Sequence, residues 1–118
     1  MPIRVVVTRD FDHMSKVAGD LVKKDIGQTL RKKKEYVLGL ATGNSPTGVY
    51  RHLATAANAG EFDSGRIRSF NLDEYVGLPG RNAQQRLMHP ESYCYFMIQE
   101  FFGLLGRKFI ESNLPCGS

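Results

Sequence analysis

The sequence contains no tryptophan and only two cysteines among its 118 residues. Cys94 and Cys116 form no CxxC pair and have no histidine cluster beside them, so neither a disulfide framework nor a zinc site is supported. No apolar run approaches the roughly 18 residues that a membrane-spanning helix requires. These absences predict a cytoplasmic protein with free thiols, no metal and no membrane partner.

Positive charge is in modest excess, with 16 Lys and Arg against 12 Asp and Glu. The clearest basic cluster, residues 31–34, falls late in a predicted helix, where cations complement the helix dipole and remain solvated. No RNP-like aromatic motif or helix-turn-helix pattern accompanies it. We therefore expect no nucleic-acid partner. The histidines, His13, His52 and His89, are scattered and are interpreted as surface or packing residues.

The composition is that of a globular protein, with 42% hydrophobic and 24% charged residues. No internal repeat, low-complexity segment or linker divides the chain, so residues 1–118 are predicted to form one domain. Apolar residues alternate between strand-like runs and three- and four-residue helical spacing along the chain. The predicted order is a strand at 3–8, a helix from Asp10 to about Lys33, a strand at 36–41, a helix from Pro46 to about 58, a strand at 67–72, and a helix from 89 to 105.

This order predicts an α/β fold: a three-layer α/β/α, Rossmann-like parallel sheet covered by helices on both faces. The strand at 3–8 is nearly continuously apolar and is expected to be buried on both sides. Three strands are few for an open parallel sheet, since such sheets average about five or six. The sheet is therefore expected to be incomplete at the C-terminus, with an edge that awaits further strands.

Residues 42–48, Thr-Gly-Asn-Ser-Pro-Thr-Gly, join a predicted strand to the start of a helix that Ser45 or Asn44 is expected to cap. Free N–H groups and the positive end of the helix dipole make such a turn a site for an anion, phosphate above all. Gly43 and Gly48 have P-loop spacing, but Val49-Tyr50 stands where Lys-Ser/Thr is needed, which disfavours ATP. On spacing alone, a turn that needs glycine only for its backbone angles remains an equal alternative.

A carboxylate pair, Asp73-Glu74, ends the third predicted strand. Ligands of open α/β sheets bind at this carboxyl edge, where a carboxylate near a phosphorylated metabolite can serve as a general base. A turn or capping pair is the structural alternative, and physical chemistry alone leaves both open. No His or Cys stands at the spacing of a nucleophilic triad.

Three blocks of the sequence carry a family resemblance. They are Leu-Gly-Leu-Ala-Thr-Gly-Asn-Ser-Pro at 38–46, Phe-Asn-Leu-Asp-Glu-Tyr-Val-Gly-Leu-Pro at 70–79, and His-Pro-Glu-Ser-Tyr at 89–93. In this order they resemble the N-terminal half of the glucosamine-6-phosphate deaminases over nearly all of the chain. The related 6-phosphogluconolactonases have a similar glycine-rich loop, but their acidic motif typically reads Asp-Glu-Arg.

The resemblance implies an enzyme of amino-sugar and carbohydrate metabolism that converts glucosamine 6-phosphate and water to fructose 6-phosphate and ammonia. It implies no metal or other cofactor. Asp73 matches the family's base, which takes a proton from C2 of the opened sugar and returns it to C1. Thr42, Gly43, Asn44 and Ser45 match the segment that holds the substrate phosphate. Glu74 and Tyr75 match the motif without an assigned step.

Two departures from the family shape the expectations. Residues 80–88 lengthen the link between the second and third blocks, which suits a divergent subfamily with altered substrate preference or regulation. The family's ring-opening His and its phosphate clamp belong to a C-terminal half, so this chain is expected to be a fragment with very low activity by itself. The alternatives are a non-catalytic sugar-phosphate-binding module, a 6-phosphogluconolactonase-like hydrolase, and a fragment that pairs with a homo-oligomer partner or a missing C-terminal half.

Overall fold

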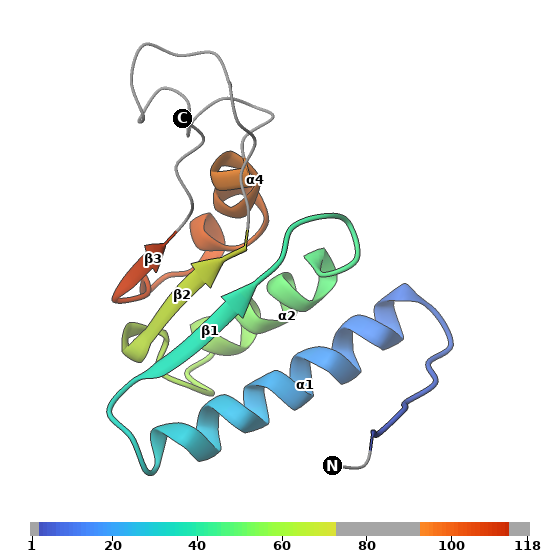
Figure 1. Ribbon diagram of the computed structural model, residues 1–118, viewed down its shortest axis with the longest axis horizontal. Coiled ribbons are helices and arrows are strands. Elements are labelled where there is room, and N and C mark those ends of the chain that lie inside the picture. Colours follow the sequence, from blue (N-terminus) through green and yellow to red (C-terminus); the bar gives the residue numbers. More distant parts are fainter. Residues whose placement is uncertain (1–2, 73–92, 114–118) are drawn as a thin grey trace.

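The structure is a computed structural model, which describes residues 3–72 and 93–113 (Figure 1). Its helices are α1 (Phe11–Leu30), α2 (Thr47–Asn58) and α4 (Tyr93–Glu100), with short 3-10 turns at η1 (Ser64–Arg66) and η2 (Phe102–Leu104). The strands β1 (Tyr36–Leu40), β2 (Ile67–Asn71) and β3 (Glu111–Asn113) form one parallel sheet in the order β1-β2-β3. The predicted α/β class with a parallel sheet is confirmed.

The long helix α1 is held at both ends by side chains. Asp10, the predicted N-cap, accepts a hydrogen bond from the His13 N–H at 2.8 Å. At the other end, the Arg66 guanidinium donates to the carbonyl oxygens of Leu30 at 3.0 Å, Lys33 at 2.8 Å and Lys34 at 2.9 Å. A cation from just before β2 therefore satisfies carbonyls that a helix C-terminus leaves unpaired.

The core lies between the sheet and the helices, and all three described helices contribute to it. The rings of Tyr50 from α2 and Phe101 stack with centroids 5.0 Å apart, and Phe109 meets Phe101 edge to face at 5.4 Å. Met97 of α4 and Ile26 of α1 are fully buried in the same cluster. This aromatic packing fixes α2 and α4 against one end of the sheet.

The strand predicted at residues 3–8 is wrong. The structure has no strand there, and Ile3, Val5 and Val7 are strongly exposed. A β-branched run is compatible with a sheet, but a strand persists only when a neighbour completes its hydrogen bonds. In the part of the chain that the structure describes, the sheet runs from β1 to β3, and residues 3–8 pair with neither of its outer strands.

The expectation that helices cover both faces of the sheet is not met by the described residues. Side chains alternate along β1 and β2, so that Leu40 and Ile67 face the core while Val37 and Phe70 face outward. Val37 is 65% exposed and Phe70 45% exposed. The outer face, defined by Val37, Phe70 and the following Leu72, is apolar and open. Coverage of both faces was predicted from the order of strands and helices, which does not say which face each helix will cover.

An ion-pair network crosses the outer face at the amino ends of the strands. Arg68 of β2 contacts Glu35 with Nε at 2.7 Å and Glu111 of β3 with Nη1 at 2.9 Å. Hydrogen bonding to Arg68 lowers the pKa of both carboxyls. The network joins β2 and β3 to the residue that precedes β1. Because its members are partly solvated, it specifies their pairing more than it stabilises them.

The C-terminal elements differ from the sequence prediction in two ways. The last helix, predicted to continue to 105, ends at Glu100, and the chain tightens into η2 at Phe102, so that Leu104 is 42% exposed instead of core-facing. The backbone of Phe101 leaves helical angles, which lets its ring turn into the aromatic cluster. The predicted start of this helix at 89–92 lies outside the described residues. Strand β3 was not predicted, since three residues with little apolar character carry almost no pattern.

No helix among residues 3–72 and 93–113 combines the length and apolar character needed to cross a membrane.

Candidate functional site

The turn at residues 42–48 leaves β1 and enters α2 at the carboxyl edge of the sheet (Figure 1). Gly43 has a φ of 105°, in the left-handed region that side chains disfavour. Gly43, Asn44 and Ser45 are exposed, and Thr42 is half-buried. The structure thus places the predicted phosphate-binding residues together in one accessible turn.

The predicted cap of α2 is wrong. The N-cap is Pro46, the first helical residue is Thr47, and no side chain of Asn44 or Ser45 bonds to the first turn. Thr47 instead donates its hydroxyl to the Asn44 carbonyl oxygen at 2.8 Å, and the Tyr50 N–H donates to the Pro46 carbonyl at 3.0 Å. The turn closes through its backbone, so the asparagine and serine side chains are not consumed by capping.

Helices α1 and α2 differ in how their N-termini are capped. Helix α1 is capped by Asp10 and carries Asp12 in its first turn. Helix α2 has neither a side-chain cap nor an acidic residue in its first turn. Among the described residues, no side chain therefore caps the first N–H groups of α2 and no carboxylate in its first turn opposes its dipole, which is the arrangement that favours a bound anion.

Tyr50 anchors the beginning of the turn to α2. Its hydroxyl accepts a hydrogen bond from the Ala41 N–H at 3.1 Å and donates a short one to the Ala41 carbonyl oxygen. Burial raises the pKa of the Tyr50 phenol, so the hydroxyl stays protonated and able to donate. The sequence pattern identified Tyr50 only as a departure from the P-loop motif, since periodicity does not show where a hydroxyl will point.

Removing this hydroxyl with Tyr50→Phe is expected to lower the free energy of unfolding by about 0.5–1.5 kcal/mol, because both backbone groups of Ala41 lose a side-chain partner in a partly buried position. Urea denaturation monitored by circular dichroism measures the loss. Phe102→Tyr, which adds a hydroxyl at a half-buried ring, serves as the reverse control and should change stability little. An unchanged unfolding midpoint for Tyr50→Phe would show that the hydrogen bonds between the Tyr50 hydroxyl and Ala41 do not stabilise the turn.

The end of β2 lies beside this turn. Asn71, its last residue, is aligned with Leu40, the last residue of β1, and both side chains are buried on the helix-covered face. Asp73, the predicted base, and Glu74 and Tyr75 lie outside the described residues. The structure therefore brings the two strand ends together and leaves the placement of Asp73 a prediction.

A cavity of about 260 Å³ lies between α1 and the start of α2. Thr47 and Gly48 line it from α2, and Lys16 and Arg51 add positive charge. Arg51 is already paired with Glu100 at 3.1 Å, and Ser15 packs so tightly on Gly48 that a Cβ there would meet its hydroxyl at 2.0 Å. This close helix contact explains the small residues at both positions, so the cavity is mainly a packing feature.

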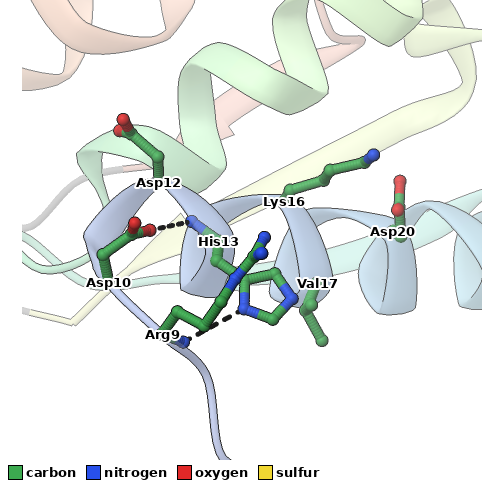
Figure 2. Close-up of a pocket in the computed structure, with 7 residues that line it drawn as sticks. All are labelled: Arg9, Asp10, Asp12, His13, Lys16, Val17 and Asp20. Carbon is green, nitrogen blue, oxygen red and sulfur yellow. Dashed lines mark hydrogen bonds between the residues drawn. The ribbon is translucent and has the colours of Figure 1, made fainter.

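A second depression runs along the first turns of α1 (Figure 2). Its charges are mixed, with Arg9 and Lys16 beside Asp10, Asp12 and Asp20. The hydrogen bonds within it belong to the start of the helix: Asp10 accepts from the His13 N–H, and the Arg9 N–H donates to His13 Nδ1 at 3.1 Å. These contacts are explained by helix capping.

His52 has a structural partner, in agreement with its interpretation as a packing residue. Its Nε2 lies 2.8 Å from Asp20 Oδ1, and hydrogen bonding to His52 lowers the pKa of the Asp20 carboxyl. Gly19 makes room for the ring, since a Cβ there would lie 2.3 Å from His52 Cδ2. Within the described ranges, no three His, Cys, Asp or Glu side chains gather closely enough to hold a metal ion.

Known proteins resemble this chain in sequence and in fold. No family model matches the sequence. A glucosamine-6-phosphate deaminase from Thermoanaerobacter sp. (strain X514) is 40% identical over 115 residues, which are 98% of this chain and 41% of the relative. The chain is homologous to part of the glucosamine-6-phosphate deaminases. It spans about two fifths of the curated relatives it matches.

Solved structures extend the likeness. A monomeric glucosamine-6-phosphate deaminase superposes with a TM-score of 0.76 and 28% identity, covering 98% of this chain and 44% of that one. A 6-phosphogluconolactonase from Thermotoga maritima gives a TM-score of 0.71 at 16% identity over 93% of this chain and 44% of the other. The second likeness concerns the fold alone. The deaminase resemblance predicted from the three sequence blocks is confirmed, and so is its partial extent.

Proposed function

We propose that the chain is the phosphate-binding and proton-transferring part of a glucosamine-6-phosphate deaminase. Glucosamine 6-phosphate and water are converted to fructose 6-phosphate and ammonia, by an aldose–ketose isomerisation that ends in loss of the amine. The observation that carries the proposal is the uncapped N-terminus of α2 behind the left-handed Gly43 turn, in a chain 40% identical to a deaminase.

The turn supplies the binding half of this function. The backbone N–H groups at the start of α2 and the hydroxyls of Thr42 and Ser45 surround a position where a phosphate dianion is favoured. Asn44 adds an amide that is not used to cap the helix. Tyr50 holds the turn at Ala41, so the donors are organised before the anion arrives. Preorganised donors bind an anion without first losing conformational entropy.

Asp73 supplies the chemical half. As the general base, its carboxylate removes the proton from C2 of the opened sugar. The electron pair forms a C1–C2 double bond, and the C1 carbonyl oxygen takes up a proton, which gives an enolamine. The same group then delivers the proton to C1, which leaves an imine at C2. Water adds to this imine and ammonia departs, giving the ketose. A positioned carboxylate contributes roughly 10²- to 10⁴-fold to such a step.

In the isolated chain, we expect phosphate binding without appreciable catalysis. Matched relatives are more than twice as long, and the groups that open the sugar ring and clamp the phosphate are expected in the remainder. We therefore expect the isolated chain to bind phosphate esters weakly and to turn over very slowly. A sugar-phosphate-binding module without catalysis is the alternative, and turnover in a completed protein distinguishes the two. The lactonase alternative rests on fold likeness only.

The binding half is tested with Gly43→Ala in this chain. The substitution forces a side chain into the left-handed region and distorts the turn, so we expect the affinity for inorganic phosphate to fall about tenfold. NMR titration of backbone amides into the tens of millimolar measures it. Wild-type chain that shows no amide shifts with phosphate at these concentrations would contradict the proposal.

Gly60→Ala is the matched control. Gly60 also has a positive φ, 80°, and it lies at the opposite end of the same helix, just after α2. Neither glycine has a neighbour within 4 Å of a built Cβ, so the two substitutions impose similar backbone strain without a steric clash. Gly60→Ala should destabilise the chain by a similar amount, about 1 kcal/mol, and leave phosphate affinity unchanged. Equal loss of affinity in both variants would mean that general destabilisation, not the turn, controls binding.

A further inference from the structure

Asn71 is buried at the carboxyl end of β2 with no partner for its side chain. The residue is 8% exposed, and neither Oδ1 nor Nδ2 makes a hydrogen bond in the described part of the chain. Folded proteins pair nearly all such groups, because a buried amide without partners opposes folding. A polar side chain kept at this position therefore requires an explanation other than stability.

The position of Asn71 suggests one. In the register of the sheet it is aligned with Leu40, so its side chain lies on the helix-covered face one strand away from where the phosphate turn begins. Neighbouring strands are roughly 4.8 Å apart. Tyr50 tethers the beginning of that turn on the same face. The unpaired amide thus lies on the same face of the sheet as Leu40, the strand residue that comes just before the proposed phosphate-binding turn.

We infer that Asn71 is a substrate-binding residue that recognises the hydroxyl-bearing carbon chain of the sugar phosphate. Its carboxamide has two N–H donors and one carbonyl acceptor, and adjacent sugar hydroxyls can both accept and donate hydrogen bonds to such a group. Inorganic phosphate offers no comparable carbon-bound group. This inference rests on the proposed function, since the turn at 42–48 must hold the phosphate for the sugar chain to reach Asn71.

Asn71→Leu tests the inference, because leucine has nearly the same shape and removes both polar atoms. The wild-type chain should bind glucosamine 6-phosphate more tightly than inorganic phosphate in NMR titrations. In the variant, affinity for the sugar phosphate should fall roughly three- to tenfold, as expected for a lost hydrogen bond, while affinity for phosphate is unchanged. The urea midpoint of unfolding should rise. Asn71→Ala should give the same binding pattern if leucine fits poorly.

Ser69→Ala is the matched control. Ser69 lies two residues earlier in β2 on the same face, is fully buried, and its hydroxyl is also without a partner among the described residues. Its removal should not lower stability and should leave both affinities unchanged. The inference is overturned if both Asn71 variants still bind glucosamine 6-phosphate more tightly than inorganic phosphate, as the wild-type chain does. It is also overturned if Ser69→Ala loses this preference to the same extent. Neither outcome overturns the proposed function. Absence of phosphate binding by the wild-type chain overturns both.

Discussion

Replacing Asp73 with Asn is expected to reduce ammonia release by about 10³-fold or more when the chain is part of a complete deaminase. Asparagine is nearly isosteric with aspartate but cannot accept the C2 proton, so the isomerisation loses its base. Binding of the sugar phosphate should be almost unaffected, because we expect the phosphate contacts from the turn at 42–48 and from the rest of the deaminase, and not from Asp73. The change should therefore appear in kcat with little change in KM.

The protein for this measurement is a chimaera. This chain replaces the 115 matched residues of the Thermoanaerobacter deaminase, to which it is 40% identical. Ammonia is followed with a coupled assay, and the sugar-phosphate Kd is measured in parallel. Asp63→Asn is the control: Asp63 is a carboxylate near η1 that pairs with Arg107 at 3.2 Å, away from the carboxyl edge of the sheet. Full activity in Asp73→Asn would refute the assignment of Asp73 as the base. If the unsubstituted chimaera folds and binds the sugar phosphate but has no turnover, the chain is better explained as a binding module.

The second large effect concerns stability. Phe101→Ala is expected to lower the free energy of unfolding by about 3–5 kcal/mol. The ring is 1% exposed, stacks on Tyr50 and meets Phe109 edge to face, so truncation leaves a cavity where α2, α4 and the C-terminal segment meet. Because domains are stable by only about 5–15 kcal/mol, this loss should shift the urea midpoint greatly or unfold the chain.

Phe70→Ala is the matched control for Phe101→Ala. It removes the same atoms from a ring that is 45% exposed on the outer face of the sheet. The expected cost is about 1 kcal/mol or less, since much of the ring already contacts water. A cost for Phe70→Ala comparable to that of Phe101→Ala would show that the outer face is covered in solution, for example by a second copy of the chain. Sedimentation at several concentrations distinguishes that outcome.

Much of the turn at 42–48 could be predicted because it depends on local chemistry. Small residues between a strand and a helix predict a turn in which glycine supplies the backbone angles, and the left-handed Gly43 agrees with this, while the anion site stays a prediction. The cap was predicted wrongly. Asn44, Ser45 and Pro46 all suit a helix start, and only the path of the chain decided that Pro46 takes the cap position. Asn71 was missed because a polar residue inside a strand signals nothing until its burial and missing partners are known.

The sequence by itself determined the order of the elements from α1 to β2, the Asp10 cap and the parallel α/β class, because these depend on side-chain periodicity and neighbouring residues. Tertiary structure decided the features that join distant residues: Arg66 at the end of α1, Tyr50 at Ala41, and β3 beside β2. It also decided that residues 3–8 do not form a strand. A strand or a helix end is completed by groups far away in sequence, and local pattern does not identify those groups.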